Sequence, residues 1–165
     1  MKTLWLADDV VVPAGLDSER FRLRPLTIHD VIKDFDAVMS SRAELRDLFG
    51  PGTQWPADNL TIEQNLIDLA WHQKEFQTRG SFTYTVVSPD ESRVLGCVYL
   101  FPPRDSSVDV VIYYWVRSSE LAGGLEQQLL EQLHGWLARE WPFKCLSWPG
   151  RGPLGQTLNV HHAQV

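Results

Sequence analysis

The residues best suited to chemistry form a turn of small side chains between an apolar strand and an amphipathic helix. The apolar run covers residues 108–116, the turn covers residues 117–124, and a helical pattern begins at Leu125. A turn that opens a helix points unpaired backbone N–H groups outward, with the positive end of the helix dipole behind them. Three turn residues lack bulky side chains, so an anion can approach the backbone: Ala122, Gly123 and Gly124. The segment predicts a diphosphate site, although small residues also occupy such turns for packing alone.

The elements that position this turn follow from the pattern of apolar residues. We expect strands at 20–24, 81–88, 94–101, 108–116 and 143–148, and helices at 27–39, 42–49, 61–80 and 124–140. Residues 1–18 are expected to form an irregular arm, and residues 149–165 an irregular tail. The main order, β-α-α-β-β-β-α-β, predicts a single α/β (α+β) domain over residues 1–165, with a central twisted mixed sheet and helices on both faces.

The composition of the chain argues against several classes of protein. The chain has 165 residues, of which 44% are hydrophobic and 22% charged, as in an ordinary soluble domain. Its net charge of −6 argues against nucleic acid as a partner, because binding to phosphates needs a basic surface. No apolar run is long enough to span a membrane, and Asp8 and Asp9 leave no room for a signal peptide. Cys97 and Cys145 have apolar neighbours typical of reduced thiols, which favours the cytoplasm.

Three segments resemble the GNAT superfamily of N-acetyltransferases. Residues 21–27, followed by Asp30, are similar to the opening strand of that family and its entry into the first helix. Residues 81–100, which contain Gly96, are similar to its central hairpin. The segment from Tyr114 to Leu125 resembles the acyl-CoA motif, written Q/R-x-x-G-x-G/A after the fourth strand. The resemblance covers about residues 19–148 and implies a GNAT-like fold.

The resemblance also implies that acetyl-CoA is the co-substrate and that no metal ion is needed. In this family, main-chain groups near the end of the fourth strand bind the pantetheine; the corresponding residues here are Tyr114, Trp115 and Val116. A plain core strand explains the same side chains equally well. The diphosphate is then expected at the turn, against the backbone of Arg117, Leu121, Ala122, Gly123, Gly124 and Leu125.

Acetyl transfer requires a group that takes the proton of the amine and a group that protonates the leaving thiolate. Asp109 is the best candidate for a general base acting through a water molecule, and a solvated carboxylate at a strand end is the simpler interpretation. Tyr99, Tyr113 and Tyr114 are possible acids, since a phenol with a pKa of about 10 can match a thiolate, and a core tyrosine is the simpler interpretation for each. Of the three, Tyr114 is the one expected at the catalytic site. Four aromatic residues are candidates for the wall of an acceptor pocket: Phe49, Trp55, Trp71 and Trp148.

The turn departs from the family motif in ways that bear on activity. Ser119 stands in the Gln/Arg position, and Ala122 stands in the first Gly position. Glu120 and Glu126 place carboxylates where they would repel a diphosphate, with Arg117 as a partial counter-charge. Only about 17 residues follow the last expected strand, without a tyrosine among them, whereas the family usually adds a helix and a strand that often bring a catalytic Tyr.

These features leave two functions open. The first is an N-acetyltransferase that moves an acetyl group from acetyl-CoA to a primary amine of a small molecule, peptide or protein. The second is a catalytically inactive GNAT-fold module that binds CoA or regulates a partner. We expect a cytoplasmic protein without nucleic-acid or membrane partners, and the sequence is compatible with a homodimer.

Overall fold

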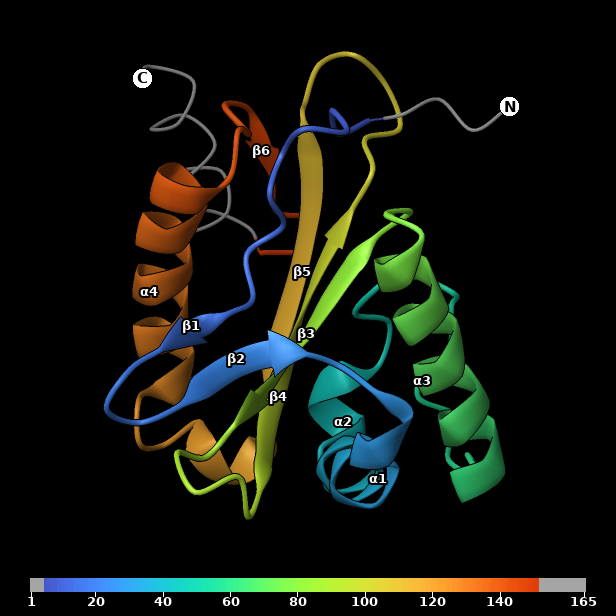
Figure 1. Cartoon of the computed structure of the whole chain (residues 1–165). Helices are drawn as coiled ribbons and strands as arrows, with labels where there is room; N and C mark the ends of the chain where they lie inside the picture. The colour runs from blue at the N-terminus through green and yellow to red at the C-terminus, as the bar shows by residue number, and fades with distance from the viewer. Residues whose placement is uncertain (1–4, 152–165) are drawn as a thin grey trace.

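The computed structural model describes residues 5–151, which form a sheet with helices on both of its faces (Figure 1). The strands are β1 (Leu16–Asp17), β2 (Arg22–Pro25), β3 (Phe82–Val87), β4 (Val94–Phe101), β5 (Val110–Val116) and β6 (Leu146–Ser147). The helices are α1 (Val31–Ser40), α2 (Arg42–Leu45), α3 (Ile62–Gln77) and α4 (Leu125–Glu140), with 3-10 turns η1 (Ile28–Asp30) and η2 (Ser118–Glu120). No helix in this part of the chain is long and apolar enough to cross a membrane.

The strands form a mixed sheet in the order β1-β2-β3-β4-β5-β6. Each strand from β1 to β4 is antiparallel to the next, and β5 pairs with β6 in parallel. The crossover between β5 and β6 is α4, as a parallel pair requires. The expected mixed sheet is therefore confirmed. Because only Val110 and Val111 pair with β6, the rest of β5 extends beyond the end of that strand.

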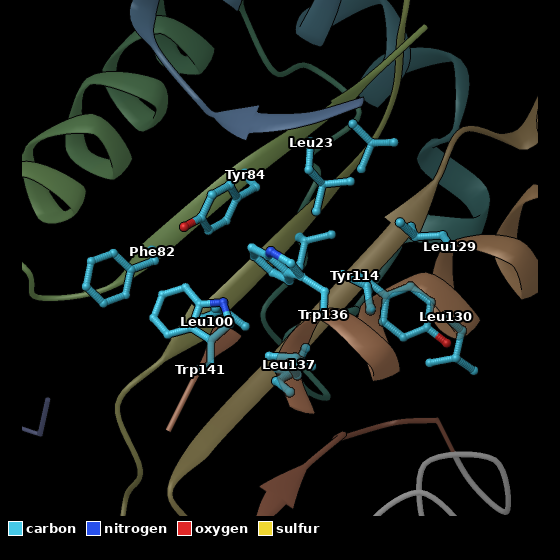
Figure 2. Close-up of a cluster of buried hydrophobic side chains, with 14 of the residues drawn as sticks. Leu23, Phe82, Tyr84, Leu100, Tyr114, Leu129, Leu130, Trp136, Leu137 and Trp141 are labelled. Atoms are coloured by element: carbon cyan, nitrogen blue, oxygen red, sulfur yellow. The ribbon is translucent and has the colours of Figure 1, made fainter. Parts of the chain in front are cut away.

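One face of the sheet is closed by α4 and carries the larger core (Figures 1 and 2). Alternate strand residues, among them Tyr84 and Tyr114, point toward this face because side chains alternate along a strand. Trp136 of α4 meets Tyr84 edge-on, with ring centroids 5.0 Å apart. The buried stripe of α4 consists of Leu125, Leu129, Leu130, Leu133, Trp136 and Leu137. The predicted amphipathic helix thus supplies the cover of this face.

The opposite face of the sheet lies under α1 and α3 (Figure 1). Tyr99, Tyr113 and Trp115 point to this side, where they belong to a second core cluster. The indole N–H of Trp115 donates to the Tyr99 hydroxyl at 3.0 Å and links β5 to β4. A Cβ on Gly96 would collide with the Trp115 carbonyl oxygen, so glycine is required for the close approach of these two strands. The expected helices on both faces are present.

Two expected elements are shorter than the sequence predicts. The helix expected at 42–49 ends at Leu45, because the backbone leaves the helical conformation at Arg46, with ψ of 124°, and Asp47 is left-handed with φ of 61°. The strand expected at 143–148 contains only Leu146 and Ser147. Just before it, the backbone N–H groups of Lys144 and Cys145 donate to the Asp109 carboxylate instead of to a neighbouring strand.

The described part of the expected arm, residues 5–18, is more regular than expected, and residues 1–4 lie outside the described residues. Leu16 and Asp17 form β1, which pairs with Leu23 and Arg22 of β2. The arm also contacts the core, since the Tyr84 hydroxyl donates to the Pro13 carbonyl at 2.6 Å. A two-residue strand is too short to give a periodic pattern, which explains why the sequence did not reveal it. Of the expected tail, residues 152–165 lie outside the described residues.

Candidate active site

The turn after β5 consists of η2 followed by a left-handed glycine. The backbone N–H groups of Glu120 and Leu121 donate to the carbonyls of Arg117 and Ser118, at 2.9 and 3.2 Å. Gly124 has φ of 77°, a conformation that favours glycine, and its N–H donates to the Leu121 carbonyl at 3.2 Å. No side chain caps α4 at Gly124. The helix therefore begins with its first N–H groups uncapped.

Several backbone N–H groups along this turn have no acceptor within residues 5–151. They belong to Ala122, Gly123, Leu125, Glu126 and Gln127. The first two of these residues are exposed, and neither carries a side chain that would shield the backbone. Unpaired N–H groups at a helix N-terminus, combined with the helix dipole, attract anions. The turn has the backbone arrangement of an anion site.

Two arginines from distant segments flank the turn. Arg93, which precedes β4, has Nη1 3.2 Å from Glu120 Oε1 and donates from Nη2 to the Ser119 hydroxyl at 3.3 Å. Arg20, which precedes β2, donates to the Gly123 carbonyl at 3.0 Å and lies 3.9 Å from Glu120 Oε2. The Glu120 carboxylate therefore has two guanidinium partners, neither of which the sequence pattern indicated.

A third arginine compensates the other carboxylate. Arg151, which follows β6, has Nη1 2.9 Å from Glu126 Oε1. Three arginines thus surround two glutamates, and the excess positive charge lies beside the unpaired N–H groups of the turn. The repulsion expected from Glu120 and Glu126 is offset by side chains that the fold brings together from three parts of the sequence.

Arg117 is turned inward rather than toward the turn. Its side chain is buried, with Nη1 donating to the Val94 carbonyl at 3.0 Å and Nη2 lying 2.8 Å from Asp36 Oδ2. Nη2 also donates to the Ser40 hydroxyl at 3.3 Å. The counter-charge expected from Arg117 therefore comes from Arg20, Arg93 and Arg151. Arg117 could therefore contact a ligand at the turn only through its backbone.

The other residues expected at the cofactor site are mostly buried. Trp115 lies in the core under α1 and α3, and Val116 lies in the core under α4. Leu125 belongs to the α4 core, whereas Leu121 is partly exposed at the turn. Contacts from the three buried residues to a ligand must therefore come from the main chain.

Tyr114 lies in the core rather than in an open cleft. Its side chain is fully buried, and its hydroxyl has no hydrogen-bond partner within residues 5–151. The Arg151 guanidinium lies 3.6 Å from the centre of its ring, and the Trp148 ring contacts it edge-on at 5.8 Å. Burial raises the pKa of Tyr114, while Arg151 lowers it. The segment after β6 therefore packs against β5 at the point where the two strands are no longer paired.

Asp109 lies at the start of β5, at the opposite end of that strand from the turn. Its Oδ2 accepts from the backbone N–H groups of Lys144 and Cys145, at 2.8 and 2.9 Å. Its own N–H donates to the Cys145 carbonyl at 2.7 Å. These bonds position the chain as it enters β6, and the carboxylate remains exposed. Its role as a general base stays a prediction.

A cavity of about 300 Å³, called here the α1–α3 pocket, lies between α1, α3 and β4 on the face opposite α4. Aromatic rings form much of its wall: Phe49, Trp55, Trp71, Tyr99 and Phe101. Four polar side chains also line it: Asp34, Asn65, Asp68 and His72. An apolar pocket with a few convergent polar groups is the usual form of a small-molecule site.

The titratable groups of the α1–α3 pocket are perturbed by burial. Asp34 is 4% exposed, and burial raises its pKa to about 6 although Asn65 Nδ2 donates to its Oδ2 at 2.9 Å. Burial also raises the pKa of Asp68. His72 has Nδ1 3.0 Å from the Thr83 hydroxyl, and burial lowers its pKa to about 4. At neutral pH the pocket therefore holds a neutral imidazole and negative carboxylates.

The sequence predicted some of the residues that line this pocket. Three of the four expected wall residues, Phe49, Trp55 and Trp71, do line it, whereas Trp148 lies on the α4 face. The polar residues were missed. The available signal was Asp34, which falls on the apolar stripe of α1, three residues after Val31 and four before Val38. Within residues 5–151 no group of three or more His, Cys, Asp or Glu side chains could hold a metal ion.

No family model and no curated protein matches this sequence. Solved structures do match its fold. Ribosomal-protein-S5-alanine acetyltransferase from Vibrio fischeri is 14% identical with a TM-score of 0.68, over 91% of this chain and 82% of that chain. The ribosomal L7/L12 α-N-protein acetyltransferase RimL, in complex with CoA, is 16% identical with a TM-score of 0.66, over 91% and 81%. The microcin C7 self-immunity acetyltransferase MccE, in complex with acetyl-CoA and AMP, is 11% identical with a TM-score of 0.65, over 94% and 84%.

These neighbours are GNAT acetyltransferases, and the match covers nearly the whole of the described chain. The chain therefore has the GNAT fold that its sequence resemblance implied.

Proposed function

We propose that the chain is an N-acetyltransferase that moves an acetyl group from acetyl-CoA to a primary amine. The observation that carries the proposal is the row of unpaired N–H groups between Ala122 and Gln127, flanked by Arg20 and Arg93. The fold neighbours support it, because the RimL structure contains CoA and the MccE structure contains acetyl-CoA. Two neighbours are named for ribosomal proteins, so the proposal includes a peptide amine beside a small-molecule amine as acceptor, and a cytoplasmic location.

The residues at the turn fit CoA in charge and in shape. The N–H groups of Ala122, Gly123 and Leu125 would bind diphosphate oxygens, with Arg20 and Arg93 as the nearest cations. Main-chain groups of β5 beyond Val111 have no partner strand on the β6 side among the described residues and would bind the pantetheine amides. When bound, acetyl-CoA supplies the acetyl group as a thioester. The chain itself must bind and orient the amine and take one proton from it.

Binding of CoA is the first test. We expect calorimetry to show binding of CoA and much weaker binding of pantetheine, which lacks the diphosphate. Glu120→Gln should tighten CoA binding and Arg93→Gln should weaken it, each by about two- to fivefold, the range for one screened charge at a helix terminus. Arg104→Gln is the control, because Arg104 is exposed in the loop between β4 and β5, at the other end of β5. Absence of CoA binding, or equal effects of Arg93→Gln and Arg104→Gln, would refute the site.

Asp109 is tested separately as the general base. If it draws the amine proton through a water molecule, Asp109→Asn should lower kcat by about 10²–10⁴ and leave the affinity for acetyl-CoA unchanged. Turnover is followed as thiol release over a panel of primary amines. Because the carboxylate also holds the chain at Lys144 and Cys145, the unfolding midpoint of the variant must be measured as well. Full activity of the variant would reduce Asp109 to this structural role.

One observation favours a second candidate, a GNAT-fold module that binds CoA without turnover. Trp148 and Arg151 pack on Tyr114 beside the unpaired part of β5, where the pantetheine arm would bind. A module of this kind would bind CoA in calorimetry and acetylate no amine in the panel. Truncation after Ser147, which removes both side chains, would then leave turnover absent, whereas recovery of turnover would favour the enzyme.

A further inference from the structure

The α1–α3 pocket has a chemistry that points to the acceptor. We propose that this pocket binds the acceptor as a primary ammonium ion on an apolar body, with the ammonium group between Asp34 and Asp68 and the body against Trp55 and Trp71. The proposal names the acceptor class of the transferase and rests on that function. It is carried by an uncompensated buried carboxylate inside a cavity.

A comparison of Asp30 and Asp34 shows that the environment of the Asp34 carboxylate is unusual. Asp30, 6% exposed, forms two hydrogen bonds with the Arg24 guanidinium, at 2.7 and 3.0 Å. Asp34, buried even more deeply, has no ion-pair partner within residues 5–151 and accepts one hydrogen bond, from Asn65. Burying a carboxylate without a cation costs free energy, whereas a pairing cation recovers much of that cost. Asp34 is in the state expected of a group whose cation arrives with a ligand.

Among the described residues 5–151, no cationic side chain from the elements packed around Asp34 pairs with its carboxylate. The titratable or polar groups that face Asp34 are Asn65, Asp68 and His72 from α3, Cys97 and Tyr99 from β4, and Asp30 from the preceding turn. The imidazole of His72 is neutral at pH 7 because burial lowers its pKa to about 4. A ligand that enters the α1–α3 pocket therefore meets negative charge alone, which selects for a cation and against an acid.

The aromatic wall adds the second requirement. Phe49 packs against Trp55 and Tyr99, with centroid distances of 5.2 and 5.0 Å, and so forms a continuous ring surface. Trp71 is 48% exposed and lies at the rim of the pocket beside Asp68, which is also exposed. Aromatic faces attract ammonium ions and bury apolar groups. The volume of about 300 Å³ suits a small amine or the first residue of a peptide.

The test compares 2-phenylethylamine with 2-phenylethanol, which has the same body without the charge. We expect calorimetry to show binding of the amine, and binding of the alcohol at least about tenfold weaker, as for loss of a charge-assisted contact. Asp34→Asn keeps an oxygen for Asn65 and should weaken binding of the amine by about 10- to 100-fold. Glu63→Gln on α3 is the matched control, since it removes one exposed carboxylate of the same helix outside the pocket. Equal binding of the two probes, or unchanged binding of the amine by Asp34→Asn, would overturn the proposal.

A second variant keeps the test valid if Asp34→Asn fails to fold. Asp68→Asn at the exposed rim should weaken binding of the amine by a smaller factor, and an unchanged affinity would argue against the ammonium position. Lowering the pH below about 6 should weaken binding of the amine by wild type, because protonation of Asp34 removes its charge while the amine stays charged. An affinity that stays constant from pH 7.5 to 5 would contradict the role of Asp34.

The source of the ammonium group is identified by a third probe. The tripeptide Phe-Ala-Ala carries the same apolar body beside a peptide N-terminus, and tighter binding of this peptide than of 2-phenylethylamine would assign a peptide acceptor. Tighter binding of the amine would assign a small molecule. CoA titrations in parallel separate the two proposals: binding of CoA without discrimination between amine and alcohol overturns the pocket proposal alone. Discrimination without binding of CoA overturns the transferase.

Discussion

The two faces of the sheet are built from the same strands and differ in how they use burial. Under α4, Tyr84, Trp136 and Trp141 fill the space between helix and sheet, and Figure 2 shows their rings packed together. Under α1 and α3, the ring of Tyr99 borders a cavity that also holds the buried Asp34. The face under α4, called here the filled face, contributes stability through its packed rings. The face under α1 and α3 retains an unpaired carboxylate and ring surface that borders the cavity. Because side chains alternate between the two faces of a sheet, the same strands can fill a core on one face and line a cavity on the other.

The largest expected effect compares two tryptophans. Trp136 is fully buried under the sheet, so Trp136→Ala should lower the free energy of unfolding by about 3–5 kcal/mol. Trp71 is half exposed at the rim of the α1–α3 pocket, and Trp71→Ala should cost less than about 1 kcal/mol. Urea unfolding of both variants measures the difference. Similar losses at the two positions would mean that the pocket face also carries the stability of the fold.

A somewhat smaller effect, of about 3 kcal/mol for each group, concerns the pH dependence of stability. The folded pKa of Asp34, about 6, lies above its ordinary value of 3.8. Its contribution to stability is therefore present below pH 4 and is lost as the pH rises through 6. The folded pKa of His72, about 4, lies below its ordinary value of 6.5. Its contribution is present above pH 6.5 and is lost as the pH falls toward 4.

The two groups change the free energy of unfolding in opposite directions as the pH rises. In wild type the two changes should therefore largely cancel between pH 4 and 6.5. His72→Asn should leave the Asp34 slope, with stability falling as the pH rises. Asp34→Asn should leave the His72 slope, with stability rising over the same interval. Denaturant unfolding at several pH values checks this, and the differences from wild type cancel the other titrating groups. Parallel pH curves for all three proteins would show that neither group is perturbed in the fold.

The smallest expected effect compares two tyrosines on the filled face. The Tyr84 hydroxyl donates to the Pro13 carbonyl at 2.6 Å, so Tyr84→Phe should cost about 1 kcal/mol of stability. The Tyr114 hydroxyl is buried without a partner within residues 5–151, so Tyr114→Phe should change stability by less than about 0.5 kcal/mol or raise it. Turnover is measured on the same variants. A large loss of kcat in Tyr114→Phe alone, at unchanged stability, would establish Tyr114 as the acid.

Much of the fold could be predicted because its signals are local. The helical segments expected to start at residues 27 and 61 do start there, each with a capping box, of Thr27 with Asp30 and of Thr61 with Gln64. The apolar stripe of α4 and the β-branched run of β5 also belong to single segments. Where a prediction was wrong, contacts outside the segment are involved: the helix expected to reach residue 49 ends at Leu45, after which the Asp47 N–H donates to the Trp55 carbonyl, and β1 pairs with β2.

The candidate site shows the same difference between features with a local sequence signal and features made by distant residues. The turn from Arg117 to Leu125 could be singled out in the sequence because the prediction for it depends only on backbone geometry and small residues within one stretch of chain. The arginines around it could not, since Arg20 and Arg93 reach Glu120 only after β2 and β4 join the sheet. The α1–α3 pocket likewise combines residues from α1, α3 and β4, and its unpaired charge becomes apparent only when all the neighbours of Asp34 are known.

The inward direction of Arg117 has one more consequence. A single guanidinium fastens the residue before η2 to Asp36 and Ser40 of α1, and α1 is also the helix that carries Asp34. Ser118 adds two contacts, since its N–H donates to the Ser41 hydroxyl at 3.0 Å and its hydroxyl donates to Glu44 Oε2 at 2.6 Å. Together these contacts form an anchor between the turn proposed to bind CoA and the helix that carries Asp34, and a large shift of either would strain the other. Any coupling free energy transmitted through this anchor is reciprocal, so an anion at the turn and an amine in the pocket must alter each other's affinity by the same factor.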